Sequence, residues 1–360
     1  MRYLITGGAG FIGSHLADYL IERGHHVHIL DNLSTGRLEN IQHLFHHERF
    51  ESTVADILDY HTLEQHISRC DQVFHLAAAV GVRLIMEQPV ETIITNVQGT
   101  ENILKLASYY GKKVMLASTS EVYGKLMEKS QDIESLSETD DWTLGPTTKR
   151  RWAYACSKAI DEFLALAYSE ERQLKVVIAR FFNTVGPRQT GRYGMVIPNF
   201  VQSALCNESI KVFGDGEQSR CFTYVGDAIR AITQLMDKDG AEGQVYNIGS
   251  DQEITINQLA QRVKELAKSN SDIEHIPYEK TYGPGFEDMR RRTPNIEKLQ
   301  KEINYKPTYD IDAILRDVIA YFRLAKSSTF TAKPDEQMSP KENMSGQLQH
   351  NGHSTTPFPL

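Results

Sequence analysis

The sequence lacks the cysteine patterns of disulfide-stapled and zinc-binding proteins. Its four cysteines are scattered with no C-x-x-C pair, at Cys70, Cys156, Cys206 and Cys221. This spacing predicts free thiols in a reducing compartment. Histidines are frequent in the N-terminal third, but no carboxylates stand beside them at metal-ligand spacing. We therefore expect surface histidines and no metal site.

Long apolar runs and basic blocks are lacking too. No apolar stretch approaches the roughly 20 residues that span a bilayer. Met1 leads straight into an apolar segment from Tyr3 to Thr6, with no signal peptide before it. The net charge of −8 disfavours nucleic-acid binding. These absences predict a cytoplasmic protein that binds neither membranes nor nucleic acids.

The first half of the chain does contain a regular alternation of short apolar runs and amphipathic helices. The predicted strands are Tyr3–Thr6, His26–Leu30, Phe50–Val54, Gln72–Leu76, Lys113–Ala117 and Lys175–Arg180. The predicted helices are Ser14–Arg23, Tyr60–Ser68, Val90–Tyr110 and Ala153–Glu171. This order is typical of an α/β fold, a doubly wound parallel sheet of the Rossmann type, which binds ligands at the carboxyl ends of its strands.

The pattern changes after about Asn183, where glycines and prolines break the chain into short elements. A further strand is predicted at Val245–Gly249 and a helix at Ile256–Leu266. We expect residues 1–182 to form the cofactor domain and 183–326 to form mainly a smaller α/β substrate lobe, with segments returning to the main sheet. Residues 327–360 are rich in small and polar residues, which predicts a disordered tail.

A glycine-rich turn follows the first predicted strand. The segment Thr6–Gly13 reads T-G-G-A-G-F-I-G and opens the first helix. Gly7 permits a tight turn, Gly10 lets a pyrophosphate approach the backbone, and Gly13 lets the helix pack on the strand. The helix N-terminus then offers unpaired N–H groups to the phosphates. The turn predicts a dinucleotide site formed by Gly7, Gly10, Phe11, Ile12 and Gly13.

An acidic residue ends the second predicted strand. Asp31, followed by Asn32, lies where a carboxylate can bind the ribose hydroxyls of NAD and repel the 2′-phosphate of NADP. NAD is therefore the expected cofactor. Two points stand against this interpretation: Arg37 lies nearby and could accept a 2′-phosphate, and Asp31 could simply begin the turn that runs to Gly36.

Tyr154 and Lys158 are four residues apart in a predicted helix, so their side chains share a face. An ammonium beside a phenol favours the phenolate, and we expect Lys158 to lower the pKa of Tyr154. Such a tyrosine can take a proton from a sugar hydroxyl while a hydride leaves the same carbon. The pair alone is a weak signal, since helix packing also produces it. The dinucleotide turn and Ser118–Glu121 strengthen it.

Several motifs in order now resemble those of the extended short-chain dehydrogenase/reductases that act on nucleotide sugars. The resemblance runs from Met1 to about Ala325 and rests on T-G-x-x-G-x-x-G, Asp56-Ile57, His75–Ala78, Ser118–Gly124, Tyr154/Lys158, Arg180–Asn183 and Phe213–Gly216. It implies that Asp56 and Ile57 flank the adenine. It also implies that Leu76, Ala77 and Ala78 line the pyrophosphate and ribose.

The same resemblance implies a site for the nucleotide diphosphate of the substrate. Asn183 and Arg220 would hold the diphosphate, and Phe213 would lie near the base. Arg220 fits this role independently, because arginine binds phosphate oxygens through a planar fork of donors. A plain surface arginine is the alternative.

The resemblance implies oxidation at C4 of the sugar, with the hydride returned later. Thr119, Ser120 and Glu121, together with Arg292 two residues before Pro294, resemble the residues of UDP-glucuronate decarboxylases. The resemblance implies conversion of UDP-glucuronate to UDP-xylose or its 4-keto intermediate. There Glu121 would crowd or polarise the substrate carboxylate, and Arg292 would be its electrostatic partner or a proton donor. Dehydratases carry an Asp-Glu pair where this chain has Ser120-Glu121, which disfavours dehydration.

Alternatives to decarboxylation remain open at this point. If Arg192 clamped the carboxylate, the product would be the 4-epimer, UDP-galacturonate, and UDP-glucose is a further possible epimerase substrate. A non-catalytic NAD-sensing protein and a reductase that releases NADH are more distant interpretations.

The resemblance also implies a homodimer. Relatives of this kind pair through two helices, here Val90–Tyr110 and Ala153–Glu171. The apolar residues Phe163, Leu164, Leu166 and Ala167 fit such pairing, but they also fit core packing.

Overall fold

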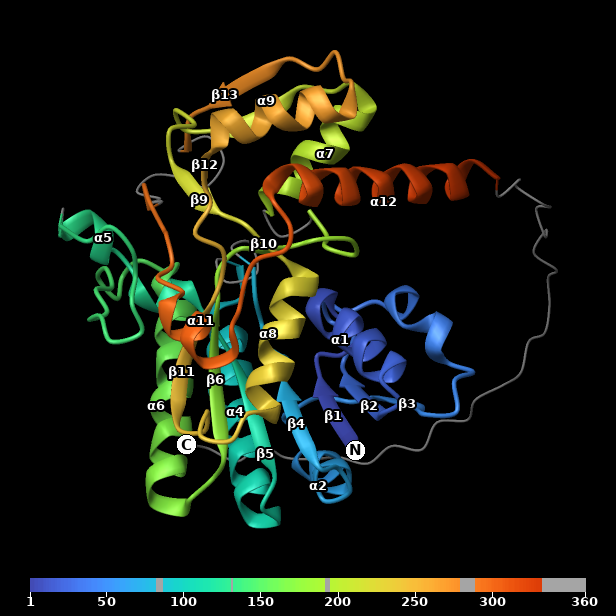
Figure 1. Ribbon diagram of the computed structural model, residues 1–360, viewed down its shortest axis with the longest axis vertical. Helices are drawn as coiled ribbons and strands as arrows, with labels where there is room; N and C mark the ends of the chain where they lie inside the picture. Colours follow the sequence, from blue (N-terminus) through green and yellow to red (C-terminus); the bar gives the residue numbers. More distant parts are fainter. Residues whose placement is uncertain (82–86, 131, 192–194, 279–288, 332–360) are drawn as a thin grey trace, which may run out of the picture.

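A computed structural model of the 360-residue chain describes residues 1–81, 87–130, 132–191, 195–278 and 289–331. Its centre is a seven-stranded parallel sheet flanked by helices on both faces (Figure 1). The strand order is β11 (Gln244–Ile248), β6 (Val176–Phe181), β5 (Lys113–Thr119), β4 (Gln72–His75), β1 (Arg2–Thr6), β2 (His26–Asp31) and β3 (Phe50–Val54). The predicted doubly wound α/β fold is confirmed.

The alternation of side chains along the strands builds a core on each face of the sheet. In β1, Tyr3 and Ile5 pack into one apolar cluster while Leu4 packs into the other. The first cluster includes α1 (Phe11–Glu22) and α8 (Val225–Asp237), and the second includes α2 (Tyr60–Ile67), α4 (Pro89–Tyr110) and α6 (Trp152–Arg172). Both faces are therefore buried, as continuous apolar strands require.

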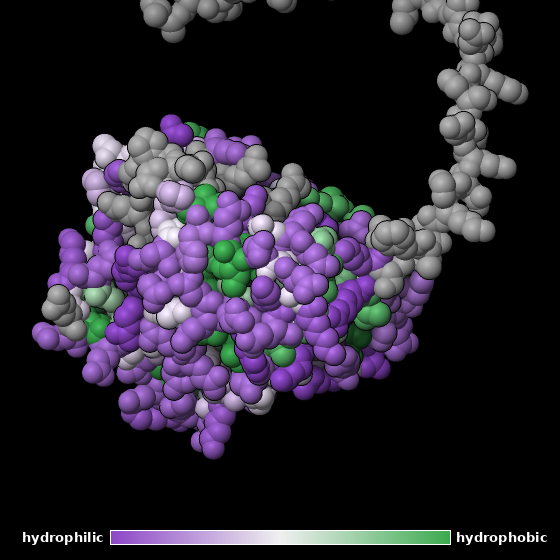
Figure 2. Space-filling model, turned by 90° about the horizontal axis from the view of Figure 1, so that it is seen from above, coloured by the Kyte–Doolittle hydropathy of each residue, from purple (hydrophilic) through white to green (hydrophobic). Residues whose placement is uncertain are grey.

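A smaller lobe lies beyond the carboxyl ends of the strands (Figure 1). Its core gathers side chains from α7 (Val196–Cys206), α9 (Ile256–Ala267), α12 (Ile311–Thr331) and β8 (Ile210–Phe213). Two-stranded pairs complete it: β10 (Thr223–Tyr224) with β7 (Thr184–Val185), β12 (Glu253–Thr255) with β9 (Ser219–Cys221), and β13 (Ile273–Ile276) with β8. The other helices of the described residues are α5 (Leu126–Lys129), α11 (Glu297–Ile303) and the short 3-10 helices η1 (Leu38–Asn40), η2 (Gln42–Leu44) and η3 (Ser120–Tyr123). Viewed from this end, the surface is mostly hydrophilic with small apolar areas (Figure 2).

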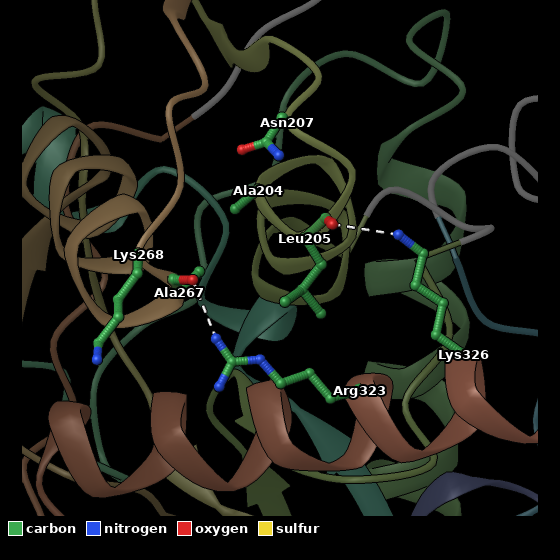
Figure 3. A pocket seen from close by; sticks show the side chains of 7 residues that line it. All are labelled: Ala204, Leu205, Asn207, Ala267, Lys268, Arg323 and Lys326. Carbon is green, nitrogen blue, oxygen red and sulfur yellow. Dashed lines mark hydrogen bonds between the residues drawn. The ribbon is translucent and has the colours of Figure 1, made fainter.

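Helix α12 closes the lobe by capping two other helices. Arg323 donates a hydrogen bond to the carbonyl of Ala267 at the end of α9, over 3.0 Å (Figure 3). Lys326 donates to the carbonyl of Leu205 near the end of α7, over 3.1 Å. Cations at helix C-termini satisfy orphan carbonyls and oppose the helix dipole. Arg323 and Lys326, with their partners Ala267 and Leu205, line the cavity between α7, α9 and α12.

The C-terminal boundary differs from the prediction. Helix α12 continues through Thr331, so the polar segment predicted to begin at residue 327 starts inside a helix. Residues 332–360 lie outside those described. Within the described ranges, no helix combines the length and the apolar character that crossing a membrane requires.

The order of the strands places the site. The sequence leaves β1 for β2 and β3 on one side, then crosses back to β4 on the other side of β1. Ligands of doubly wound sheets bind at this reversal, outside the carboxyl ends. The glycine-rich turn follows β1, and the segment from Leu76 follows β4. The two predicted cofactor segments therefore flank the switch point.

Candidate active site

The glycine-rich turn has the tight geometry that its sequence predicts. Gly7 has a φ of 71°, a left-handed conformation that favours glycine, and a Cβ there would lie 2.8 Å from the backbone N of Ala77. A Cβ on Gly13 would lie 2.3 Å from the carbonyl oxygen of Gly7. Helix α1 begins directly after Gly10 and has no acidic residue in its first turn. Its N-terminus therefore suits a pyrophosphate, so the described residues fit a dinucleotide.

Asp31 ties this turn to the second strand. Its carboxylate accepts hydrogen bonds from the backbone N of Ala9, over 2.9 Å, and of Leu33, over 2.8 Å. Burial raises the pKa of Asp31 even though these donors oppose the shift. Asn32 donates to Asp56 over 2.8 Å, which joins the ends of β2 and β3. Each carboxylate oxygen of Asp31 keeps a lone pair for a ribose hydroxyl, the role that we predict for it.

A buried histidine network supports the opposite wall of the cofactor site. His75 contacts the hydroxyl oxygens of Thr6 through Nδ1, over 2.7 Å, and of Thr100 through Nε2, over 3.1 Å. Thr6 also accepts a hydrogen bond from the backbone N of Ala77, over 3.3 Å. Burial and the nearby charge of Lys158 lower the pKa of His75 to about 3. This histidine is therefore neutral and holds the Leu76–Ala78 segment in place.

Tyr154 and Lys158 lie on α6, as predicted, but the expected effect on the tyrosine pKa is wrong for this structure. Burial and the negative charge of Glu121 raise the pKa of Tyr154 above its ordinary value, although a hydrogen bond with Thr119 opposes the shift. The Lys158 ammonium lies 2.7 Å from the carboxylate of Asp161. Burial and Glu121 therefore set the direction of the pKa shift of Tyr154.

Glu121 lies between two guanidinium groups. Arg292 Nη2 is 2.8 Å from its Oε1, and Arg151 Nη2 is 3.5 Å from its Oε2. Burial alone would raise the pKa of Glu121, but the charges of Arg292, Arg151 and Arg220 outweigh it and hold the pKa below its ordinary value. Glu121 thus brings two guanidinium groups close to Tyr154, and guanidinium groups bind carboxylates and phosphates through charge-assisted hydrogen bonds.

The three consecutive arginines 290–292 have separate partners. Arg290 pairs with Asp215 over 2.8 Å and Arg291 with Glu253 over 3.0 Å, both near the surface. Arg292 is 6% exposed and also donates to Ser120 Oγ over 3.3 Å. The structure therefore brings Arg292, and not its two neighbours, to Ser120 and Glu121.

The predicted diphosphate residues lie in the smaller lobe. Asn183 Nδ2 donates to the carbonyl of Cys221 over 2.9 Å, and Arg220 is buried with its Nη1 2.7 Å from the carbonyl of Ser219. Phe213 ends β8, and its carbonyl accepts a hydrogen bond from Gln218. Asn183 and Arg220 therefore converge on the segment around Cys221. Arg192 lies outside the described residues.

Arg151 is the functional candidate that the sequence patterns did not single out. It lies immediately before α6, three residues from Tyr154, and its side chain is 13% exposed. It lies in a run of basic residues, Lys149-Arg150-Arg151, that is typical of a solvated surface segment. Only the fold shows that this guanidinium contacts Glu121, which lies on a different element.

The parallel sheet, the glycine-rich turn and the Tyr154–Lys158 pair define an extended short-chain dehydrogenase/reductase. Residues 4–318 match the protein family described as GDP-mannose 4,6 dehydratase, and the chain belongs to that family. It is thereby an enzyme of the NAD-dependent group of sugar-nucleotide decarboxylases, epimerases and dehydratases.

Similar proteins carry the names of several reactions within this group. A UDP-N-acetyl-α-D-glucosaminuronate decarboxylase from Bacillus cytotoxicus is 43% identical over 89% of this chain and 98% of its own length. UDP-glucuronic acid decarboxylase 1 from Xenopus tropicalis is 35% identical over 97% of this chain and 79% of its own. The NAD complex of UDP-glucose 4-epimerase from Thermus thermophilus has a TM-score of 0.77 at 29% identity, covering 90% of this chain and 99% of that one.

Proposed function

We propose that this protein uses NAD to decarboxylate a UDP-linked hexuronic acid, oxidising the sugar at C4 first. The observation that carries the proposal is Glu121 held between Arg292 and Arg151 beside Tyr154. Two guanidinium groups at this position fit a substrate that has a carboxylate close to its reacting carbon. The decarboxylases of Bacillus cytotoxicus and Xenopus tropicalis support the same reaction class.

NAD, when bound, supplies the acceptor for the C4 hydride and returns it later. Once ionised, Tyr154 takes the proton of the 4-hydroxyl, and Thr119, which is hydrogen-bonded to Tyr154, helps to hold that hydroxyl. The 4-ketone and the C6 carboxylate then form a β-keto acid. The C5–C6 bond breaks, carbon dioxide leaves, and the bonding electrons pass through C5 to the oxygen on C4. A solvent proton then adds at C5 and leaves the 4-ketone, and Tyr154 gives its proton back to the oxygen on C4 when that ketone is reduced.

The arginine cluster explains how the chain favours this bond cleavage. Arg292 and Arg151 attract the substrate carboxylate, while Glu121 is already paired with both guanidinium groups and repels the second anion. Charge leaves the carboxylate in the transition state and reaches the oxygen on C4, so the repulsion falls as the reaction proceeds. Arg292 acts as an electrostatic partner, because a guanidinium keeps its protons.

The sugar has two candidate forms. The relative from Bacillus cytotoxicus is named for a 2-acetamido uronate and the one from Xenopus tropicalis for glucuronate. The purified protein with NAD would be given each UDP-uronate separately, and carbon dioxide release and product mass would be recorded. Turnover of either one with loss of carbon dioxide supports the proposal. No carbon dioxide from either one contradicts it.

A 4-epimerase is the second candidate, favoured by the likeness to the Thermus thermophilus epimerase. Epimerisation shares the C4 oxidation and the roles of Thr119, Tyr154 and Lys158. The hypothesis that Arg192 holds the carboxylate out of alignment for cleavage belongs to this candidate. UDP-glucose and the two uronates would then give products inverted at C4 with every carbon retained.

A non-catalytic NAD sensor would give a third result. The protein would bind NAD and turn over no nucleotide sugar, and the Tyr154→Phe variant would function as the wild type does.

We also propose a homodimer formed through α4 and α6. Exposed apolar side chains gather on these helices: Val90 at 69%, Ile93 and Ile94 at 43% each, Ile160 at 42% and Phe163 at 64%. Trp142 packs against Phe163 with ring centroids 6.1 Å apart, which widens the apolar surface. Exposed apolar residues gathered on two neighbouring helices are typical of a protein interface. A cytoplasmic location remains a prediction from the sequence.

A further inference from the structure

The side chain of Asn247 joins three segments of the chain that are far apart in the sequence. Asn247 lies in β11 and is fully buried. Its Oδ1 accepts a hydrogen bond from the hydroxyl of Tyr123 over 2.8 Å. Its Nδ2 donates to the carbonyl of Leu136 over 2.9 Å and to that of Asn295 over 3.1 Å. One amide therefore holds partners that are 124, 111 and 48 residues away along the chain.

These three contacts need a side chain with two donors and one acceptor, which a carboxamide supplies. Both N–H groups of Nδ2 face carbonyl oxygens, and Oδ1 faces a hydroxyl. The reversed orientation would place Oδ1 against two other acceptors, so the partners fix the orientation of the amide. A buried polar group that is satisfied in this way favours a single arrangement of the segments around it.

The contact with Tyr123 holds the segment that carries Glu121. Tyr123 is buried and ends η3, two residues after Glu121. Its ring is covered by the guanidinium of Arg180, with Cζ 4.7 Å from the ring centroid. Since both the ring and the hydroxyl of Tyr123 are held, the single turn of η3 is fixed, and the place of Glu121 is set with it.

The other two contacts hold the segment that carries Arg292. Leu136 pairs with the residues that follow Arg292: its backbone N donates to the carbonyl of Thr293, and its carbonyl accepts from the backbone N of Asn295, both over 2.8 Å. The Nδ2 of Asn247 binds the carbonyls of the same Leu136 and Asn295. It thereby ties this short backbone bridge to the edge strand of the sheet.

We propose that Asn247 is a positioning residue for the Glu121–Arg292 pair, whose charged atoms lie 2.8 Å apart. It acts through Tyr123 on one side and through the Leu136–Asn295 bridge on the other. The kinetic consequence rests on the proposed function, whereas the placement of the two segments stands separately. A misplacement of about 1 Å at a reacting site can cost about 100-fold in rate, so a shift of either segment should slow the reaction.

A double-mutant cycle on kcat for UDP-uronate tests this role. Asn247→Leu removes all three contacts at similar volume, and we expect kcat to fall about 100-fold. Arg292→Met should cost about 100-fold in the wild type but at most about tenfold more in Asn247→Leu, because the contact that it deletes is already disturbed. Independent sites would instead give multiplied losses.

The effect should appear in kcat and not in KM. Asn183 and Arg220, the residues proposed for the diphosphate, lie in the smaller lobe, away from the amide of Asn247. KM should therefore stay within about threefold of the wild type, as expected when only transition-state interactions are lost. A general loss of folded structure would not separate the two constants in this way.

Two tyrosine variants provide a milder comparison. Tyr123→Phe keeps the ring and deletes one hydrogen bond to Asn247, which should lower kcat about fivefold. Tyr246 is the control, because it precedes Asn247 in β11 and is also buried. Its ring packs in the cluster on the α1 and α8 face, and its hydroxyl is hydrogen-bonded to Glu302. Tyr246→Phe should leave kcat unchanged.

Fully multiplied losses in Asn247→Leu with Arg292→Met, or equal losses in the two tyrosine variants, overturn the inference. If Asn247→Leu does not fold, the same cycle with Tyr123→Phe decides. Should the wild type release no carbon dioxide from either UDP-uronate, the proposed function fails. Hydrogen exchange on the NAD-loaded protein then tests the placement alone: Asn247→Leu should speed exchange in both residues 119–126 and residues 289–297, and a change in only one of them or in neither would overturn it.

Discussion

Removing the guanidinium of Arg292 should cost far more activity than removing that of its neighbour Arg291. Arg292→Met keeps most of the aliphatic volume but deletes the 2.8 Å contact with Glu121 and the 3.3 Å contact with Ser120. Losing one preorganised donor at a site of changing charge costs about 2.7–4 kcal/mol of transition-state stabilisation. Because Arg151 still contacts Glu121, we expect the lower end, a fall of about 100-fold in kcat.

Arg291→Met is the matched control. Arg291 is adjacent in sequence and also paired, with Glu253 over 3.0 Å, but its side chain is 49% exposed. Exposed ion pairs contribute about 0–1 kcal/mol, so its activity should stay within about threefold of the wild type. Carbon dioxide release from UDP-uronate, measured with circular dichroism on the same samples, compares the two. Equal losses in the two variants, or near wild-type activity in Arg292→Met, would refute the role given to Arg292.

Three further predictions concern stability and assembly. The folded-state pKa of His75 lies at about 3 against an ordinary 6.5, so its stabilisation is present above pH 6.5 and is lost as the pH falls. Urea unfolding should show a loss of about 2 kcal/mol between pH 7 and pH 5 that is missing in His75→Gln, and equal slopes would contradict it. Arg323→Ala, which uncaps α9, should lower the unfolding free energy by about 1 kcal/mol, with the exposed Arg69→Ala as control. Phe163→Asp should give a folded monomer by light scattering, and an unchanged mass would rule out the α4–α6 dimer.

The sheet and the cofactor turn could be predicted because their signals are local. Apolar alternation in each strand and the glycines of the first turn are properties of short segments, and the structure keeps them within a few residues. The same holds for the pitch that puts Tyr154 and Lys158 on one helix face. Each predicted strand of the first half appears in the sheet, and the predicted strand near Val245 joins it as β11.

The charges around the site could not be predicted in the same way. Contact between Glu121 and Arg292 joins distant parts of the chain, and nothing in a run of three arginines shows which one is buried. Lys158 has neighbours at both i−4 and i+3, and the helix pitch does not decide between Tyr154 and Asp161. The burial of both side chains favours the ion pair of Lys158 with Asp161, because an enclosed ammonium pairs with an enclosed carboxylate. The predicted lowering of the tyrosine pKa was wrong because burial and the charge of Glu121, a contact between distant residues, raise it.

The most direct test of the account follows the C6 carbon of the substrate. UDP-hexuronate labelled with ¹³C at C6 would be incubated with the NAD-loaded protein and observed by NMR. We predict that the label leaves the sugar as carbon dioxide and bicarbonate, with Arg292→Met slowing its release about 100-fold. Label that stays in a sugar inverted at C4 would contradict decarboxylation and establish an epimerase.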